Sequence, residues 1–307
     1  MRFFPFRRGR GKMFLYAVIF AALCGGTYTQ GISGISEALY SPGKVFNSVK
    51  NFFSPSESEA GLFVTEDSGL LDSYDVARLM AGDVRETMIL KKQGYTVQYS
   101  LRDGIPCWVS WHLKKENLNG PVERTDEFLA DDEIPSRYRV ESYDYKGSGY
   151  DRGHMCPAAD NKYSEQAMKE SFLMTNMCPQ NHTLNAESWE RLEKACRRWA
   201  GRWGDVYVVC GPVFQGHERK TIGKEHEVRV PDGFFKAVLC MKSGKEKAIA
   251  FLYANTPQRQ TMEGAMCSVD DIEALIGMDL FCNVPEPLQT RIEGSYDLRA
   301  WDNRNKY

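Results

Sequence analysis

The chain has 307 residues, of which 42% are hydrophobic and 12% aromatic. This composition excludes a disordered polypeptide and is sufficient for one large domain or two smaller ones. The formal net charge of −2 argues against a broadly basic surface that coats nucleic acid, so any site for a polyanion must be local.

The first predicted element is an export signal in residues 1–26. An uninterrupted apolar run from Met13 to Cys24 follows five basic residues, Arg2, Arg7, Arg8, Arg10 and Lys12, as in a signal peptide. A helix of that length spans about 18 Å, whereas the hydrocarbon core of a bilayer is roughly 30 Å thick. Export is therefore favoured over an uncleaved anchor in residues 13–26. A lipoprotein signal at Cys24 is disfavoured because Leu23 is not small. We expect a periplasmic, secreted or membrane-anchored protein that faces outside the cytoplasm.

Residues 27–75 are expected to be a poorly ordered linker, because they are rich in Ser, Gly and Pro. A short amphipathic helix at Val45–Phe53 is the candidate element within it. Residues 76–307 carry the globular pattern and are expected to form the folded domain.

The elements predicted for this domain are helices inserted between strands. A helix is expected at residues 75–84, and a β-hairpin follows, with arms at 95–101 and 107–113 around the turn Arg102-Asp103-Gly104. A long polar connection covers 114–148, with an extended segment at 134–140. Helices are then expected at 164–171, with Ser164 as N-cap, at 185–199 and at 269–276, and strands at 172–177, 205–211, 234–241 and 247–254. Because strands and helices do not alternate one for one, the pattern predicts an α+β fold with a mainly antiparallel sheet flanked by helices.

Eight cysteines remain if the export signal with Cys24 is removed. An even number in an exported chain permits disulfides, although the sequence does not fix their pairing. Buried free thiols are the alternative, since Cys210 and Cys240 lie in apolar, strand-like runs where cysteine often serves as a small core residue.

The stretch GSGYDRGHMCPAAD, residues 147–160, contains the candidate chemistry. His154 lies in this stretch, and Asn176, Asn185 and Glu193 follow it within 40 residues. Hydrolysis of a phosphodiester needs an activated water, a cation that neutralises transition-state charge and support for the departing oxygen. A neutral imidazole suits the first task. An oxygen-donating side chain that leaves most of the coordination shell to water suits Mg²⁺.

These residues closely resemble the DNA/RNA non-specific endonuclease family, the ββα-metal nucleases that include endonuclease G. The resemblance rests on Asp-Arg-Gly-His at 151–154 together with Asn-x-x-Pro-Gln-x-x-x-x-Asn-x-x-x-Trp-x-x-x-Glu at 176–193. It is dense over residues 147–199 and diffuse over roughly 85–285. The resemblance implies a ββα-metal core within residues 76–307 and cleavage of DNA and RNA with little sequence specificity.

The resemblance also implies a role for each matching residue. His154 would be the general base that activates water, and Asn185 the direct protein ligand of a single Mg²⁺, for which Mn²⁺ can substitute. Glu193 would act on the water shell of the metal. Arg152 would support the phosphate charge near the scissile bond, and Asn176 would hold the motif loop or the substrate. Asp151 would support these groups without touching the ion. The sequence leaves the oligomeric state undecided, and a homodimer is one alternative.

Helix geometry agrees with two of these roles. If Asn185 opens its helix, its side chain lies near the positive end of the helix dipole, where a phosphate is favoured. Glu193 follows eight residues later, rotated by about 80° and displaced by about 12 Å in an α-helix, which is too far to share one ion without intervening waters.

Two features depart from the family. The family places a further arginine before the motif, for which Arg102, Arg137 and Arg139 are candidates. Cys156 and Cys178 replace the small or apolar residues that are usual there, and a Cys156–Cys178 disulfide would tie the motif loop to the neighbouring strand.

Simpler interpretations stand beside these. His154 could be a structural histidine in a turn, Asn185 a helix N-cap, and Glu193 a surface residue paired with Arg197. At the level of function, the alternatives are a catalytically silent nucleic-acid-binding module of the same fold and a disulfide-stapled surface protein that binds other proteins.

Overall fold

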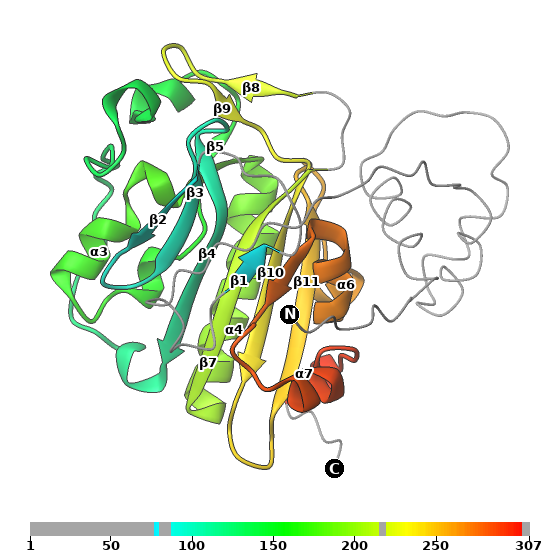
Figure 1. Ribbon diagram of the computed structural model, residues 1–307. Helices are drawn as coiled ribbons and strands as arrows, with labels where there is room; N and C mark the ends of the chain where they lie inside the picture. The colour runs from blue at the N-terminus through cyan, green and yellow to red at the C-terminus, as the bar shows by residue number, and fades with distance from the viewer. Residues whose placement is uncertain (1–76, 80–86, 215–218, 303–307) are drawn as a thin grey trace, which may run out of the picture. The chain divides into compact units, whose positions relative to one another are not determined.

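The computed structural model describes residues 77–79, 87–214 and 219–302. Within these residues, seven strands form an antiparallel sheet in the order β12-β11-β10-β7-β4-β3-β2 (Figure 1). The strands are β2 (Thr87–Lys91), β3 (Thr96–Ser100), β4 (Ile105–Lys114), β7 (Asp205–Val213), β10 (Gly233–Cys240), β11 (Lys247–Ala254) and β12 (Met266–Cys267).

Three small two-stranded sheets lie beside the main one. They pair β1 (Ala77–Leu79) with β13 (Met278–Leu280), β5 (Asp151–His154) with β6 (Met177–Gln180), and β8 (Thr221–Ile222) with β9 (Val228–Arg229). The β5–β6 pair matters most for function, because β5 consists of the Asp-Arg-Gly-His motif itself.

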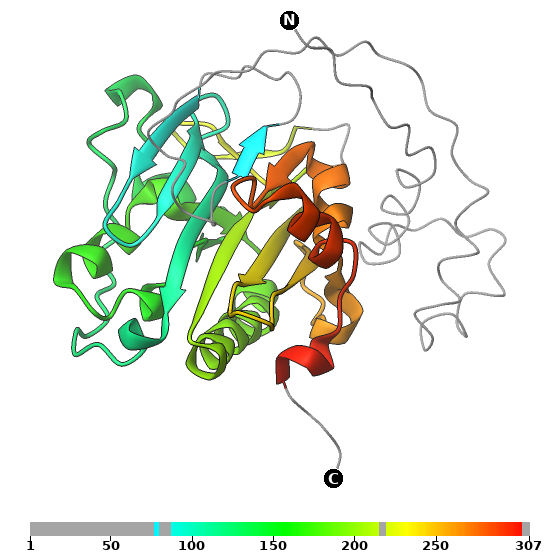
Figure 2. The ribbon, with the colours of Figure 1, turned by 60° about the horizontal axis from the view of Figure 1, so that its bottom comes forward.

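The helices are α3 (Glu165–Ser171), α4 (Glu190–Trp203), α5 (Met262–Ala265), α6 (Val269–Ile276), α7 (Glu286–Ile292) and α8 (Leu298–Asp302). A π-helical turn, η7 (Leu184–Trp189), leads directly into α4. Short 3₁₀ turns are η2 (Lys115–Asn117), η3 (Ser136–Tyr138), η4 (Ser142–Tyr145), η5 (Ala158–Asp160) and η6 (Met174–Asn176). Two views show α4 along one face of the sheet and α6 and α7 toward the opposite face (Figures 1 and 2).

The centre of the sheet is buried on both faces, which explains its apolar sequence. Every residue of β10 is buried, as expected for a strand covered from both sides. From α4, Trp199 stacks on Phe251 of β11 with ring centroids 6.1 Å apart, and Trp189, which precedes α4, meets Phe234 of β10 edge to face at 5.8 Å. The predicted apolar stripe of this helix is therefore its sheet-facing side.

Several predicted elements are confirmed. The hairpin forms from β3 and β4, β7, β10 and β11 occupy the three predicted strand regions, and α6 has the predicted bounds. The Ser164 hydroxyl accepts a hydrogen bond from the Ala167 amide at the start of α3, and Ser268 caps α6 in the same way. Such caps satisfy amides that the first helical turn leaves unpaired.

Other predicted elements are wrong. Ala77–Leu79 forms strand β1 rather than part of a helix at 75–84, because Met278–Leu280 supplies hydrogen-bond partners about 200 residues away. The strand expected at 172–177 is the 3₁₀ turn η6, and strand β6 follows it. The segment 134–140 contains the turn η3 rather than a continuous extended run.

The predicted Cys156–Cys178 disulfide does not form. Both cysteines are buried free thiols, as are Cys196, Cys210, Cys240 and Cys267 among the described residues. Asn161 Nδ2 donates a hydrogen bond to Cys156 Sγ at 3.3 Å, while Cys178 lies opposite Gly153 in the β5–β6 ladder. The alternative of small core cysteines is confirmed at Cys210 and Cys240.

The export signal, the linker and the helix at Val45–Phe53 lie outside the described residues. In the described ranges, no helix is both long enough and apolar enough to span a bilayer.

Candidate active site

The predicted site residues converge on one cavity of about 930 Å³. Its walls come from β5, from the loop and 3₁₀ turn before it, and from the helix that starts at η7. Five of the six predicted site residues line this cavity: Asp151, Arg152, His154, Asn185 and Glu193. The sixth, Asn176, is not among the residues that line it.

His154 ends strand β5, and its imidazole packs against two aromatic rings that also contact each other. The ring lies 4.9 Å from Phe172 and 5.6 Å from Phe128. Its Nε2 atom is buried and makes no hydrogen bond within the described residues. Burial first, and then the charges of Arg124 and Arg152, lower the pKa of His154 to about 3. The imidazole is therefore neutral at pH 7.

Gly153 is necessary for the close approach of β5 to β6. A Cβ atom at this position would lie 2.1 Å from Gln180 Oε1 and 2.5 Å from Gln180 Cγ. Since Gln180 is fully buried, its side chain has little room to move away. The glycine thus lets the strand that carries His154 pack tightly on its neighbour.

Asn176 braces the loop that follows His154. Its Oδ1 accepts a hydrogen bond from the Cys156 amide at 2.9 Å, and its Nδ2 donates to the carbonyls of Cys156 and Ser171 at 2.8 Å each. The side chain is fully buried, so its hydrogen bonds are made to groups inside the protein. Of the two predicted roles, loop support fits this geometry, and contact with a substrate does not.

Asn185 lies in the π-helical turn, and its carboxamide is oriented by Asp151. Asn185 Nδ2 donates to Asp151 Oδ2 at 2.9 Å, which leaves Oδ1 as the atom available to a cation. His182 Nδ1 lies 2.9 Å from the same carboxylate oxygen. The side chain of Asn181 accepts a hydrogen bond from the Thr183 amide. Asn181 therefore caps the helix, and Asn185, whose amide bonds to the Asn181 carbonyl, does not open it as expected.

The π-helical turn also changes the expected relation between Asn185 and Glu193. An α-helix would separate their directions by about 80°. Because a π-helix bonds residue i to i+5, each residue rotates less around the axis, and such turns occur frequently at functional sites. Both side chains reach the same cavity.

Glu193 has an unusual protonation equilibrium. Burial is the main cause that raises its pKa to about 7, opposed by the positive charges of Lys236 and Arg197. The simpler interpretation paired Glu193 with Arg197. Instead, Arg197 Nη1 donates to Asp160 Oδ1 at 2.8 Å. Because Arg197 pairs with Asp160, Glu193 is a polar side chain that lines the cavity.

Arginines supply positive charge beside His154. The Arg152 guanidinium donates to Ser142 Oγ and lies 4.1 Å from the centre of the Phe128 ring. The arginine before the motif that lines the cavity is Arg124, which was not among the three candidates. It comes from an irregular part of the polar connection, where no periodic pattern could point to it.

The earlier candidates have other contacts. Arg139 pairs with Asp132 at 2.8 Å, Arg137 stacks on Tyr138, and the Arg102 carbonyl accepts from Arg219. None of the three lines the cavity formed by the described residues.

Two buried charges near the site escaped the sequence analysis. Asp160 accepts hydrogen bonds from Trp111 Nε1 at 3.0 Å and from Arg197. Lys236 is fully buried, with Nζ 4.3 Å from the centre of the Trp189 ring and without a hydrogen-bond partner in the described ranges. A lysine inside the otherwise apolar run of β10 was the available signal, since lysine is almost never buried without a specific reason.

The donor set fits a hydrated hard cation. Asn185 offers one carboxamide oxygen, and the carboxylates of Asp151, Glu190 and Glu193 line the same cavity. Mg²⁺ takes oxygen ligands, keeps several waters and is bound through few protein groups. Arg124 and Arg152, which line the same cavity, suit the phosphate that such an ion would share.

Comparison with known proteins agrees with this geometry. The family model described as DNA/RNA non-specific endonuclease matches residues 79–287. The chain is 34% identical over 211 residues to "Nuclease 1, mitochondrial" of Schizosaccharomyces pombe, a match that covers 63% of this chain but only 66% of that protein. It is 33% identical to "Nuclease" of Nostoc sp., covering 69% of this chain and 80% of the relative.

A solved structure of the EndoG/EndoGI complex contains a chain with the same fold. It matches with a TM-score of 0.61 and 27% identity, covering 64% of this chain and 86% of that chain. The α+β fold is thereby confirmed, with β5, β6 and the helix from Leu184 to Trp203 as its ββα unit. The chain belongs to the DNA/RNA non-specific endonuclease family.

Proposed function

We propose that this protein is an exported, Mg²⁺-dependent endonuclease that cleaves DNA and RNA with little sequence specificity. The observation that carries the proposal is the cavity lined by His154, Asn185 and two arginines, in which His154 Nε2 has no hydrogen-bond partner among the described residues. Loss of chemistry in a silent binding module would be expected to remove His154 or Asn185, and both are present. A surface interaction protein would not explain this convergence.

His154 acts as the general base in this proposal. The neutral imidazole can accept a proton from the water that attacks phosphorus. Arg124 and Arg152 depress its pKa, so a phosphate that binds between them offsets their charge and raises the basicity of His154 when substrate is present. Arg152 stabilises negative charge at the phosphate as it develops.

A Mg²⁺ ion held by Asn185 would neutralise phosphate charge and support the departing oxygen. Asp151 fixes the carboxamide through its hydrogen bond, and Glu193, which lines the same cavity, would position water bound to the ion. Mn²⁺ can take the place of Mg²⁺ in an oxygen-rich site.

Contacts to phosphates explain the proposed breadth of substrate. Phosphates carry no base identity, and the described walls of the cavity supply arginines and carboxylates. Binding through such contacts weakens steeply as salt rises.

Export through residues 1–26 is part of the proposal, and attachment to a membrane through residues 13–26 and a homodimer are compatible with it. The Schizosaccharomyces pombe relative carries the word mitochondrial in its name. The subcellular location of this chain therefore calls for a direct measurement. Sequencing the N-terminus of the mature protein tests it, and a start at Met1 would contradict cleavage after export.

The activity is tested with the full-length protein, supercoiled plasmid and a long RNA. Both substrates should be cut in the presence of Mg²⁺, and EDTA should stop both reactions until excess Mg²⁺ restores them. Cleavage that continues in EDTA would contradict the metal requirement. Binding of both nucleic acids without any cleavage would favour the silent binding module.

Glu193 is expected to set an acid limb in the pH profile of cleavage. Its pKa of about 7 means that the carboxyl is protonated below this pH and ionised above it. Below pH 7, kcat/KM should fall about tenfold per pH unit, as for a single titrating group. Higher Mg²⁺ should move the limb to lower pH, because a nearby cation favours the ionised form.

Glu193→Gln should abolish this limb and leave a low rate that hardly depends on pH between 5 and 9. Glu187→Gln, on the same helix but outside the cavity, is the matched control and should keep the limb. If Glu193→Gln keeps it as well, another group sets the limb.

A further inference from the structure

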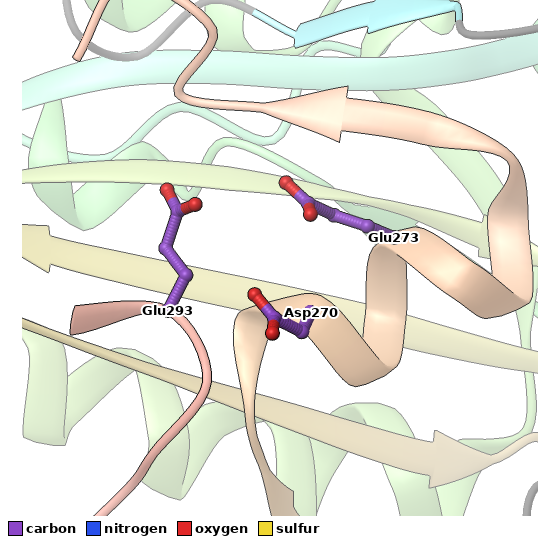
Figure 3. A group of neighbouring side chains, drawn as sticks. All are labelled: Asp270, Glu273 and Glu293. Carbon is purple, nitrogen blue, oxygen red and sulfur yellow. The ribbon is translucent and has the colours of Figure 1, made fainter. Parts of the chain in front are cut away.

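Three carboxylates gather away from the active-site cavity. Asp270 and Glu273 lie three residues apart on α6, so their side chains project from the same side of that helix. Glu293 follows α7, and its carbonyl accepts hydrogen bonds from the amides of Val269 and Asp270, which fixes it against the start of α6. One oxygen from each carboxylate lies within 4.8 Å of the others, and Figure 3 shows the three groups facing a common space.

Glu293 is the unusual member of this cluster. Its residue is 4% exposed, and its Oε1 atom is buried without a hydrogen-bond partner in the described part of the chain. Figure 3 shows this carboxylate directed toward the other two. An unsatisfied buried carboxylate is costly unless it is neutralised or coordinates a cation.

The electrostatic environment adds to this cost. Burial and then the negative charges of Glu273, Asp279 and Asp270 raise the pKa of Glu293 to about 9. Burial also raises the pKa of Glu273 to about 7, although the Leu280 amide donates a hydrogen bond to its Oε1 at 2.8 Å. A bound cation would relieve the repulsion among these groups.

We propose that Asp270, Glu273 and Glu293 bind one Ca²⁺ ion. Ca²⁺ takes oxygen ligands at 2.3–2.6 Å, so oxygens within 4.8 Å of one another can close around it with small side-chain movements. Mg²⁺ needs shorter, near-octahedral contacts and is seldom held by a cage of protein carboxylates. The ion would tie the start of α6 to the end of α7. This site is separate from the cavity that contains His154.

The test uses the full-length Asn185→Ala protein, in which metal binding at the active site is weakened, after removal of divalent ions with EDTA. CaCl₂ at about a hundred times the dissociation constant should raise the melting temperature by roughly 5–10 °C. Titration calorimetry should give one Ca²⁺ per chain. MgCl₂ at the same concentration should give a smaller rise.

Glu293→Gln in the same background should remove the Ca²⁺-dependent rise, and Glu286→Gln, an exposed acid on α7, should keep it. If Glu293→Gln does not fold, Glu273→Gln serves the same purpose. A protein without a Ca²⁺ response, an equal response in Glu293→Gln, or an equal or larger rise with MgCl₂ would overturn the proposal.

Discussion

Replacing His154 with alanine is expected to lower the rate of phosphodiester cleavage by about 10²- to 10⁴-fold, the usual contribution of a general base. The expectation rests on the neutral imidazole of His154, which lines the cavity and whose Nε2 has no hydrogen-bond partner within the described residues. The deficit should persist at saturating Mg²⁺ and at saturating DNA, because the variant lacks the proton acceptor and keeps the groups that bind metal and phosphate. Initial rates on plasmid DNA over a range of Mg²⁺ concentrations measure it.

Folding must be separated from chemistry in this experiment. The imidazole packs against Phe128 and Phe172, so its loss should cost about 1–2 kcal/mol of stability, or a few degrees in melting temperature. His112→Ala is the matched control, since His112 is a partly buried imidazole on β4 outside the cavity. A His154→Ala protein that melts normally and cleaves like the wild type would exclude His154 as the base.

The sequence predicted best those elements whose signals are local. Ser164 and Ser268 mark helix starts through caps that involve only the next few residues. The β3–β4 hairpin carries its turn residues between its arms. The motif spacing likewise identified five residues that line one cavity.

Features that depend on distant partners were missed. Strand β1 exists because it pairs with β13, and no pattern within 75–84 reveals that partner. The π-helical turn at Leu184–Trp189 has no distinctive composition, and it decides which way Asn185 and Glu193 point. Arg124 enters the site from a segment without periodicity. Spacing along the chain can thus identify a reacting group, but the residues that tune it come from the packing of the whole domain.

Replacing Asn185 with alanine is expected to impair cleavage in a different way. At limiting Mg²⁺, the rate should fall more than the 10- to 100-fold typical of losing a group that only supports a metal ligand. High Mg²⁺ should restore part of the loss, because the remaining carboxylates still attract the ion. The same addition should not help His154→Ala. The dependence of rate on Mg²⁺ concentration therefore distinguishes a metal ligand from a base.

A second substitution at this position sharpens the test. Asn185→Asp keeps an oxygen ligand but loses the hydrogen bond to Asp151 Oδ2 and places two carboxylates in contact. Its activity should lie between those of Asn185→Ala and the wild type. Asn181→Ala, which removes the cap of the same helix, should cost about 0.5–2 kcal/mol of stability and keep the wild-type Mg²⁺ dependence. If Asn185→Ala also keeps that dependence, Asn185 does not hold the ion, and the carboxylates of Asp151 and Glu193 become the ligands to test.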